Sequence, residues 1–197
     1  MFDRIVQRYD FLNRLFSFGQ DIFWRKKMAT EAVKDGTQIV LDLAVGTGDS
    51  AKELVKKGIK VIGVDISFEM IRVAINKIES NFVAVSASAY QLPFKEQSFD
   101  AVTCAFGIRN MHDTEKALKE INRIIKKGGK IVILEFSLPK GYLKEPYLLY
   151  LKKFIPFVAS FFSVRSAYEY FGSSIEGFCK PDDFIKLLGD CGFKNIK

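Results

Sequence analysis

The sequence predicts an α/β protein built on a mostly parallel sheet, and two observations support this prediction. First, strand-like and helix-like patterns alternate from Gln38 to Glu135, as expected for strands joined by right-handed helical crossovers. Second, the apolar stretch Ile39 to Leu43 runs into Gly46 and Gly48 before a helix starts, which is typical of a buried strand that turns into a ligand-binding corner. With 197 residues, 48% of them hydrophobic, the chain is sufficient for one domain with a sizeable core.

The individual elements follow from periodicity and from stop signals. Apolar residues from Ile5 to Phe16 have helical spacing, residues 17–19 break the pattern, and a second amphipathic segment covers 23–33. Ser67 is an expected N-cap, and Gly58 and the pair Gly128-Gly129 are expected helix stops. We therefore expect strands at 38–43, 60–64, 82–86, 101–105 and 130–135, and sheet-flanking helices at 49–57, 67–78, 114–125 and 181–191.

Composition and cysteine usage narrow the class of protein. The net charge of +7 permits attraction to nucleic acid or to an anionic membrane, but we expect no nucleic-acid partner, because no aromatic-basic RNA recognition motif is present. Cys104, Cys179 and Cys191 are odd in number and set among apolar residues, which argues against a disulfide framework and favours a reducing cytoplasm. No spacing typical of metal ligands is found, so no metal is expected.

Local charge discriminates between ligands for the glycine-rich corner. Residues 46–51 fit the G-x-G-x-x-A pattern, and Asp65 ends the next strand, where an acid would bind ribose hydroxyls. Asp42 and Asp49 flank the corner, and no Lys or Arg lies between Gln38 and Ala51, so a pyrophosphate is disfavoured. The sequence thus favours a cationic or zwitterionic nucleoside such as S-adenosylmethionine. Asp42 could instead bind loop amides, and Asp65 could cap the helix after Ser67.

Four stretches make the chain resemble a known family. They are the segment Tyr9 to Trp24, the loop Leu41 to Asp49, the segment Phe106 to Asn110, and the segment Arg123 to Ser137. Together they resemble the quinone C-methyltransferases of menaquinone and ubiquinone synthesis, within the class I S-adenosylmethionine-dependent methyltransferases. The resemblance implies a Rossmann-like fold with a helical N-terminal lid at 1–35, a cofactor-binding core at 38–137, a substrate-side insertion at 138–180 and a final helix at 181–197.

The resemblance also implies residue roles. Arg109, Asn110 and Tyr9 would be catalytic, with Arg109 holding a phenolate, and Asp10, Asn13 and Phe106 would bind a prenylated quinol. The cofactor S-adenosylmethionine would be bound by Asp42, Ala44, Gly46, Thr47, Gly48, Asp65, Ile66, Ser88, Ala89 and Ala105. Ser88 departs from the family pattern, since Asp or Asn commonly contacts the adenine amino group there. Arg109 could alternatively form a surface ion pair or staple its loop, Tyr9 could be ordinary core, and Glu135 could either line the pocket or be a satisfied strand-end acid.

Several expectations concern surfaces and ends. The aromatic stretch Tyr147 to Phe162 fits a groove or a membrane-facing flap for a prenyl tail, or core packing against the N-terminal helices. Arg25 to Lys27 would suit transient contact with anionic lipid heads at the inner face of a membrane, or form a solvated charged face. The family continues through a β-hairpin beyond Lys197, so we expect an unusually small sheet or a shortened chain. A homo-oligomer is possible.

Other functions remain open at this stage. Methylation of another small lipid or phenol, NAD(P)-dependent oxidoreduction, RNA methylation and a non-catalytic S-adenosylmethionine- or RNA-binding module are the alternatives. His112, the only histidine, is a candidate base, although its place before Asp113 also fits a helix start.

Overall fold

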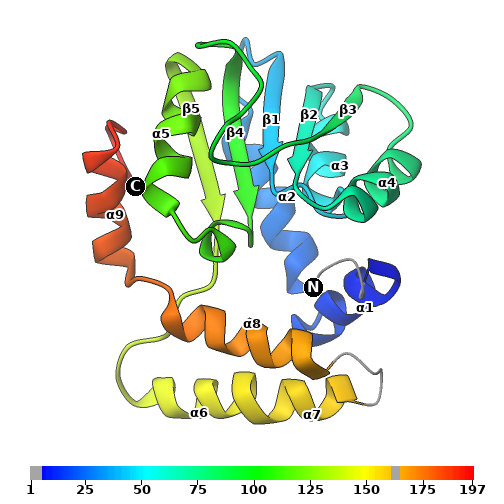
Figure 1. Ribbon diagram of the computed structural model, residues 1–197, viewed down its shortest axis with the longest axis vertical. Helices are drawn as coiled ribbons and strands as arrows, with labels where there is room; N and C mark the ends of the chain where they lie inside the picture. The colour runs from blue at the N-terminus through cyan, green and yellow to red at the C-terminus, as the bar shows by residue number, and fades with distance from the viewer. Residues whose placement is uncertain (1–5, 161–164) are drawn as a thin grey trace.

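The computed structural model describes residues 6–160 and 165–197 and contains a five-stranded parallel sheet in the order β3-β2-β1-β4-β5. Its strands are β1 (Ile39–Leu43), β2 (Lys60–Asp65), β3 (Phe82–Ser86), β4 (Phe99–Ala105) and β5 (Ile125–Leu134). The predicted α/β fold is therefore confirmed. All five strands point the same way, toward the helical cap at the bottom of Figure 1, so their carboxyl ends lie along one edge.

Helices cover both faces of the sheet and form two hydrophobic clusters. On one face, α5 (Thr114–Ile124) and α9 (Pro181–Asp190) pack over β4 and β1. On the other, α2 (Gln20–Ala32) packs over β4 and β5, α3 (Asp49–Val55) packs over β1 and β2, and α4 (Phe68–Lys77) packs beside β3. The expected cap is present, since the Ser67 hydroxyl accepts a hydrogen bond from the Met70 N–H at the start of α4.

The predicted helix stop at Gly128-Gly129 is wrong in position. Helix α5 ends at Ile124, and β5 begins at the next residue, where Ile125 pairs with Phe99. The register then shifts, because Lys130 pairs with Ala101. Gly128 has φ 75° and lies within this irregular part of the strand, so its conformational freedom serves a bulge rather than a helix end.

A helical cap lies beyond the carboxyl edge and has a hydrophobic cluster of its own. It comprises α1 (Val6–Phe16), α8 (Arg165–Gly177) and a continuous helical stretch formed by α6 (Lys144–Leu149), a π-helical turn (Tyr150–Phe154) and α7 (Ile155–Ser160) (Figure 1). Pro156 lacks an N–H, so regular helical bonding is interrupted here, next to the π turn. Leu12, Leu151, Ile155, Tyr168 and Ile175 form the centre of this cluster.

The turn after β4 is closely packed and predicts a sensitive glycine. A Cβ at Gly107 would lie 2.5 Å from the Ala44 Cβ and 3.2 Å from the Cys104 Sγ. We expect Gly107→Ala to lower the free energy of unfolding by about 1–3 kcal/mol, because overpacking forces the backbone to move. Urea denaturation tests this, with Gly189→Ala as control, since that position has open space and lies inside α9. Equal unfolding midpoints for the two variants would contradict the packing argument.

Candidate functional site

The glycine-rich corner joins β1 to α3 at the carboxyl edge of the sheet. Its backbone takes left-handed conformations at Ala44 (φ 54°), Gly46 (φ 55°) and Gly48 (φ 85°), which glycine adopts at little cost. The Asp65 carboxylate at the end of β2 accepts hydrogen bonds from the Gly46 N–H and the Ser67 N–H, both at 2.9 Å. Asp65 therefore shapes the corner and the start of α4.

Asp42 is a buried acid in β1, directly before the corner. Its side chain is almost fully buried, and the Thr103 hydroxyl, from the paired position on β4, donates to its Oδ1 atom at 2.7 Å. Its Oδ2 atom is buried and has no hydrogen-bond partner among the described residues. Burial raises the pKa of Asp42 from its ordinary value of 3.8 to about 6, although the Thr103 hydrogen bond and the Arg25 charge act in the opposite direction. The corner thus holds a carboxylate that a cation would stabilise.

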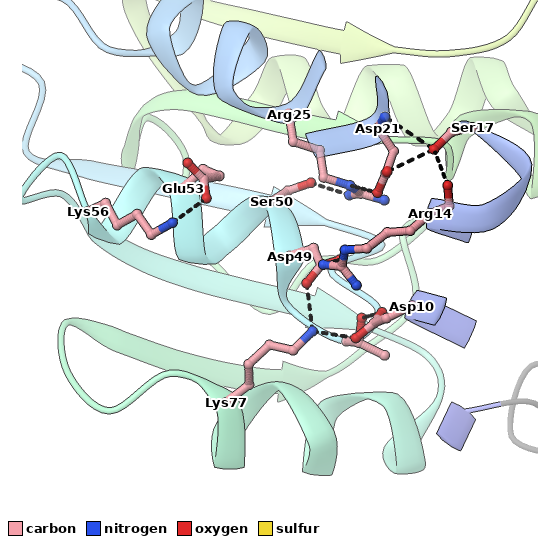
Figure 2. A network of polar contacts seen from close by, with 11 residues as sticks. Asp10, Arg14, Ser17, Asp21, Arg25, Asp49, Ser50, Glu53, Lys56 and Lys77 are labelled. Atoms are coloured by element: carbon pink, nitrogen blue, oxygen red, sulfur yellow. Dashed lines mark hydrogen bonds and ion pairs between the residues drawn. The ribbon is translucent and has the colours of Figure 1, made fainter. Parts of the chain in front are cut away.

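Cations from distant segments neutralise the rim of the corner, as Figure 2 shows. Lys77 binds both Asp49 and Asp10 at 2.6 Å, and Arg14 binds Asp49 at 3.1 Å. Burial alone would raise the pKa of Asp49, but the Lys77 hydrogen bond and charge outweigh it, so the pKa lies below its ordinary value. The absence of Lys and Arg from residues 39–50 therefore does not make the folded corner strongly acidic.

Arg25 lies at this corner and not on the surface. It is 8% exposed, its Nη1 atom donates to the Ser50 hydroxyl at 2.5 Å, and its Nε atom lies 4.0 Å from the Asp21 carboxylate. Ser17 in turn donates to Asp21 at 2.8 Å (Figure 2). The expectation that Arg25 belongs to a lipid-contacting or solvated basic face is wrong for this residue, while the neighbouring Lys26 and Lys27 are exposed. Sequence reasoning missed Arg25 as a site residue, because its partner lies 25 positions away.

A cavity of about 210 Å³ lies between the N-terminal helices, the turn after β4 and the cap. Aromatic side chains dominate its wall: Phe106 stacks on Phe136 at 4.6 Å between ring centroids, and Trp24 contacts both rings edge to face. Its other lining residues include Asn13, Ser17, Arg25, Arg109, Asn110, Tyr147, Tyr150, Leu151, Ile155 and Phe171. The wall is largely apolar, with a few polar groups from α1, α2 and the turn after β4.

Arg109 and Glu135 form a buried ion pair at one wall of the cavity. Their side chains are 6% and 7% exposed, and the Arg109 guanidinium donates to Glu135, to the Phe106 carbonyl at 2.9 Å and to the Ser174 hydroxyl at 3.2 Å. Glu135 also accepts the backbone N–H groups of Arg109 and Phe136. Arg109 therefore both lines the cavity and anchors the 3₁₀ turn Ile108–Asn110 to the end of β5, and Glu135 is the satisfied strand-end acid that the sequence left open.

Of the remaining predicted residues, some line the aromatic cavity and others lie at the glycine-rich corner. Asn13, Phe106 and Asn110 line the cavity, and the Asn110 Oδ1 atom is buried without a hydrogen-bond partner among the described residues. Asp10 does not line the cavity, because its carboxylate accepts hydrogen bonds from Thr47 and Lys77. Tyr9 lies in α1, but its side chain is outside the described residues, as are Phe161 and Phe162.

Positions after β2, β3 and β4 complete the edge. Ile66 is 80% exposed directly after Asp65, Ser88 and Ala89 follow β3, and Ala105 ends β4. The Ser88 hydroxyl accepts the Tyr90 N–H at 3.3 Å. His112 does not line the cavity; it is hydrogen-bonded to the Tyr90 hydroxyl at 2.9 Å.

S-adenosylmethionine fits the residues of this corner. The buried Asp42 Oδ2 atom offers an acceptor to an ammonium group, and exposed Ile66 offers an apolar surface to a base. The described residues contain no group of three or more side chains that could hold a metal ion.

The parallel sheet and this corner define a class I S-adenosylmethionine-dependent methyltransferase. The chain belongs to the ubiE/COQ5 methyltransferase family, whose model matches residues 1–197.

Individual relatives agree with this assignment. The chain is 39% identical to the demethylmenaquinone methyltransferase of Thermotoga maritima, over 98% of this chain and 86% of that protein. It is 42% identical to the ubiquinone/menaquinone biosynthesis C-methyltransferase UbiE of Geotalea uraniireducens, over all of this chain and 88% of that protein. Among solved structures, an S-adenosylmethionine-dependent methyltransferase from Thermotoga maritima has a TM-score of 0.71 at 25% identity and covers 98% of this chain and 80% of its own.

Proposed function

We propose that this methyltransferase adds a methyl group to a ring carbon of a prenylated quinol, demethylmenaquinol or a polyprenyl benzoquinol, in menaquinone or ubiquinone biosynthesis. The observation that carries the proposal is the aromatic cavity directly beside the cofactor corner. Phe106 follows the last residue of β4 and lines the cavity, so a flat ring held there would lie near the end of the sheet. Two relatives, which this chain matches over 86% and 88% of their length, are named for these two quinone pathways.

The cavity residues supply positioning and charge stabilisation for this reaction. When bound, S-adenosylmethionine supplies an electrophilic methyl group on a positively charged sulfur. A ring carbon becomes nucleophilic once a neighbouring phenol loses its proton, so a cation that holds the phenolate lowers the barrier. The ring carbon would take up this methyl group while the bond between methyl and sulfur breaks, and the ring would then release its proton to water. Arg109 is the proposed partner of the phenolate, since its guanidinium has several donors and stays charged.

The other roles extend the same scheme. Asn110 and Asn13, which line the cavity, would orient the quinol, with Phe106 stacked along it and Tyr9 nearby on α1. Asp10 would act through its bond to Thr47, by closing α1 over the cofactor loop, and not by touching the quinol. The cofactor would be held by Asp42, Ala44, Gly46, Thr47, Gly48, Asp65, Ile66, Ser88, Ala89 and Ala105.

Mass spectrometry of the reaction products tests the proposed function. The enzyme is incubated with S-adenosylmethionine and reduced demethylated naphthoquinols or benzoquinols, each with and without a prenyl tail. We expect a gain of one methyl group on a ring carbon. Methylation of a phenol oxygen, or of simple phenols in place of both quinols, would instead favour another small phenolic substrate.

We further propose that the outer surface of the stretch α6 to α7 contacts a membrane. The inner side of this stretch, with Tyr147, Leu151 and Ile155, lines the cavity, whereas Leu149, Phe154 and Phe157 are 61%, 52% and 62% exposed. Exposed lysines lie beside these apolar side chains. No helix among the described residues combines the length and the apolar character needed to cross a membrane. An apolar strip with cations fits the interface of an anionic bilayer, where a prenylated substrate would be held.

Removing this apolar surface should weaken membrane binding. We expect the triple variant Leu149→Ser, Phe154→Ser and Phe157→Ser to lose at least tenfold in its binding to anionic vesicles, since each buried apolar side chain contributes about 1.5–3 kcal/mol. Vesicle co-sedimentation measures this. Ile185→Ser, a change of an exposed apolar residue on α9, is the matched control and should bind like the unaltered protein. Equal binding by the triple variant would contradict the proposed surface.

A further inference from the structure

Arg25 lies between the glycine-rich corner and the aromatic cavity, and the proposed function gives it no role. Its guanidinium reaches Ser50 on α3, near the cofactor corner, and its Cζ atom lies 5.1 Å from the centroid of the Phe106 ring, which lines the cavity. The side chain is 8% exposed, so its charge is costly to keep unless a negative group compensates it. Asp21 compensates it only in part, because the closest approach is 4.0 Å and the Nε atom has no hydrogen-bond partner among the described residues.

Two buried polar atoms of opposite charge therefore lack hydrogen-bond partners near one corner. One is the Arg25 Nε atom and the other is the Asp42 Oδ2 atom. Buried polar atoms are normally satisfied, so such a pair points to a ligand that supplies both a donor and an acceptor. The amino-acid end of S-adenosylmethionine has this pattern, since its ammonium and carboxylate groups are attached to the same carbon.

The placement of other charges assigns the carboxylate to Arg25. The carboxylate and the ammonium of the ligand share one carbon, so an ammonium near Asp42 brings the carboxylate near Asp42 as well. Among the described residues, Arg25 is a cation whose charge acts on Asp42. Lys77 and Arg14 are bound to Asp49 and Asp10 at the rim. Arg109 is bound to Glu135 at the cavity wall. An arginine also suits a carboxylate because its planar donors can bind both oxygens.

We infer that Arg25, held by Ser50 and Asp21, binds the carboxylate of the methionine end of S-adenosylmethionine. Arg25 is carried by α2, which packs against α3 and forms one wall of the cavity, so a bound carboxylate would add a further contact to this helix. The inference rests on the cofactor of the proposed function and not on its quinol substrate, so the two can fail separately.

Calorimetry with two ligands tests the inference without any turnover. S-adenosylmethionine is compared with decarboxylated S-adenosylmethionine, which keeps the ammonium and sulfonium groups but lacks the carboxylate. We expect the unaltered protein to bind the complete ligand about 10- to 100-fold more tightly, as is typical of a charge-assisted hydrogen bond. Arg25→Gln should abolish this preference, by weakening binding of the complete ligand and leaving the decarboxylated one unchanged.

Two further variants keep the test decisive. Arg25→Gln combined with Asp21→Asn removes both buried charges, so it avoids an unpaired Asp21 and should fold even if the single variant does not. It should likewise bind the two ligands equally. Lys26→Gln, a change of the exposed neighbour, should retain the preference. If Arg25→Gln weakens both ligands equally, or weakens neither, the assignment of the carboxylate to Arg25 is overturned.

Discussion

Replacing Arg109 with glutamine is expected to lower the free energy of unfolding by about 3–5 kcal/mol at neutral pH, because it leaves the buried Glu135 carboxylate without its cation. Both side chains are less than a tenth exposed, and Arg109 also donates to Phe106 and Ser174. A loss of activity in this variant alone would therefore not separate a structural role from a chemical one. Urea denaturation followed by circular dichroism measures the stability change.

A double variant separates the structural role of Arg109 from its proposed role in holding the phenolate. Arg109→Gln with Glu135→Gln removes both charges, so we expect most of the lost stability to return. If Arg109 holds the phenolate, this folded double variant should still lose about 10²–10³ in kcat, the typical effect of removing one transition-state donor. Glu135→Gln alone keeps the guanidinium, and its kcat should fall far less. Full activity in the double variant would show that Arg109 only supports the fold.

The strands and their order of appearance could be predicted because their signals are local. Apolar runs, glycines and the Ser67 cap act within a few residues, and the structure places the strands within two residues of most expected ends. The exception is β5, which begins at Ile125 and not at the expected residue 130, because Ile125 already pairs with Phe99. Strand pairing is a tertiary contact and leaves no periodic signal in the glycine- and lysine-rich segment 126–130.

The charge of the site could not be predicted from the corner alone. Asp49 was identified as an acid next to the ligand, but Arg14 and Lys77, which neutralise it, lie 35 and 28 positions away. Arg25 belongs to a basic run that is otherwise exposed, and only the packing of α2 against α3 shows that it turns inward. Asp42 is different: its burial follows from its place inside an apolar strand, so its burial can be predicted from the sequence.

Binding of S-adenosylmethionine is expected to weaken about tenfold between pH 7.5 and pH 5, because Asp42 becomes protonated in the ligand-free protein. Its pKa is raised to about 6, and a neighbouring ammonium group favours the ionised form, so binding releases a proton below neutral pH. At pH 5 only about one tenth of the ligand-free molecules have an ionised Asp42. Above pH 7 the affinity should be constant. Calorimetry in buffers of different ionisation enthalpy measures both the affinity and the released proton.

Asp42→Asn tests the same explanation, because it should make the ligand-free protein more stable and its binding of S-adenosylmethionine weaker. A raised pKa means that the protonated acid favours the folded state below pH 3.8 and that this advantage is lost as the pH rises to 6. The rise from 3.8 to about 6 corresponds to about 3 kcal/mol at neutral pH, so the neutral amide should stabilise the ligand-free protein by up to about that amount. The amide oxygen of this variant can still accept the Thr103 hydrogen bond.

The same variant should bind S-adenosylmethionine at least tenfold more weakly at pH 7.5, with no dependence on pH. A variant that is less stable, or whose binding still weakens at pH 5, would mean that Asp42 is not the group that titrates.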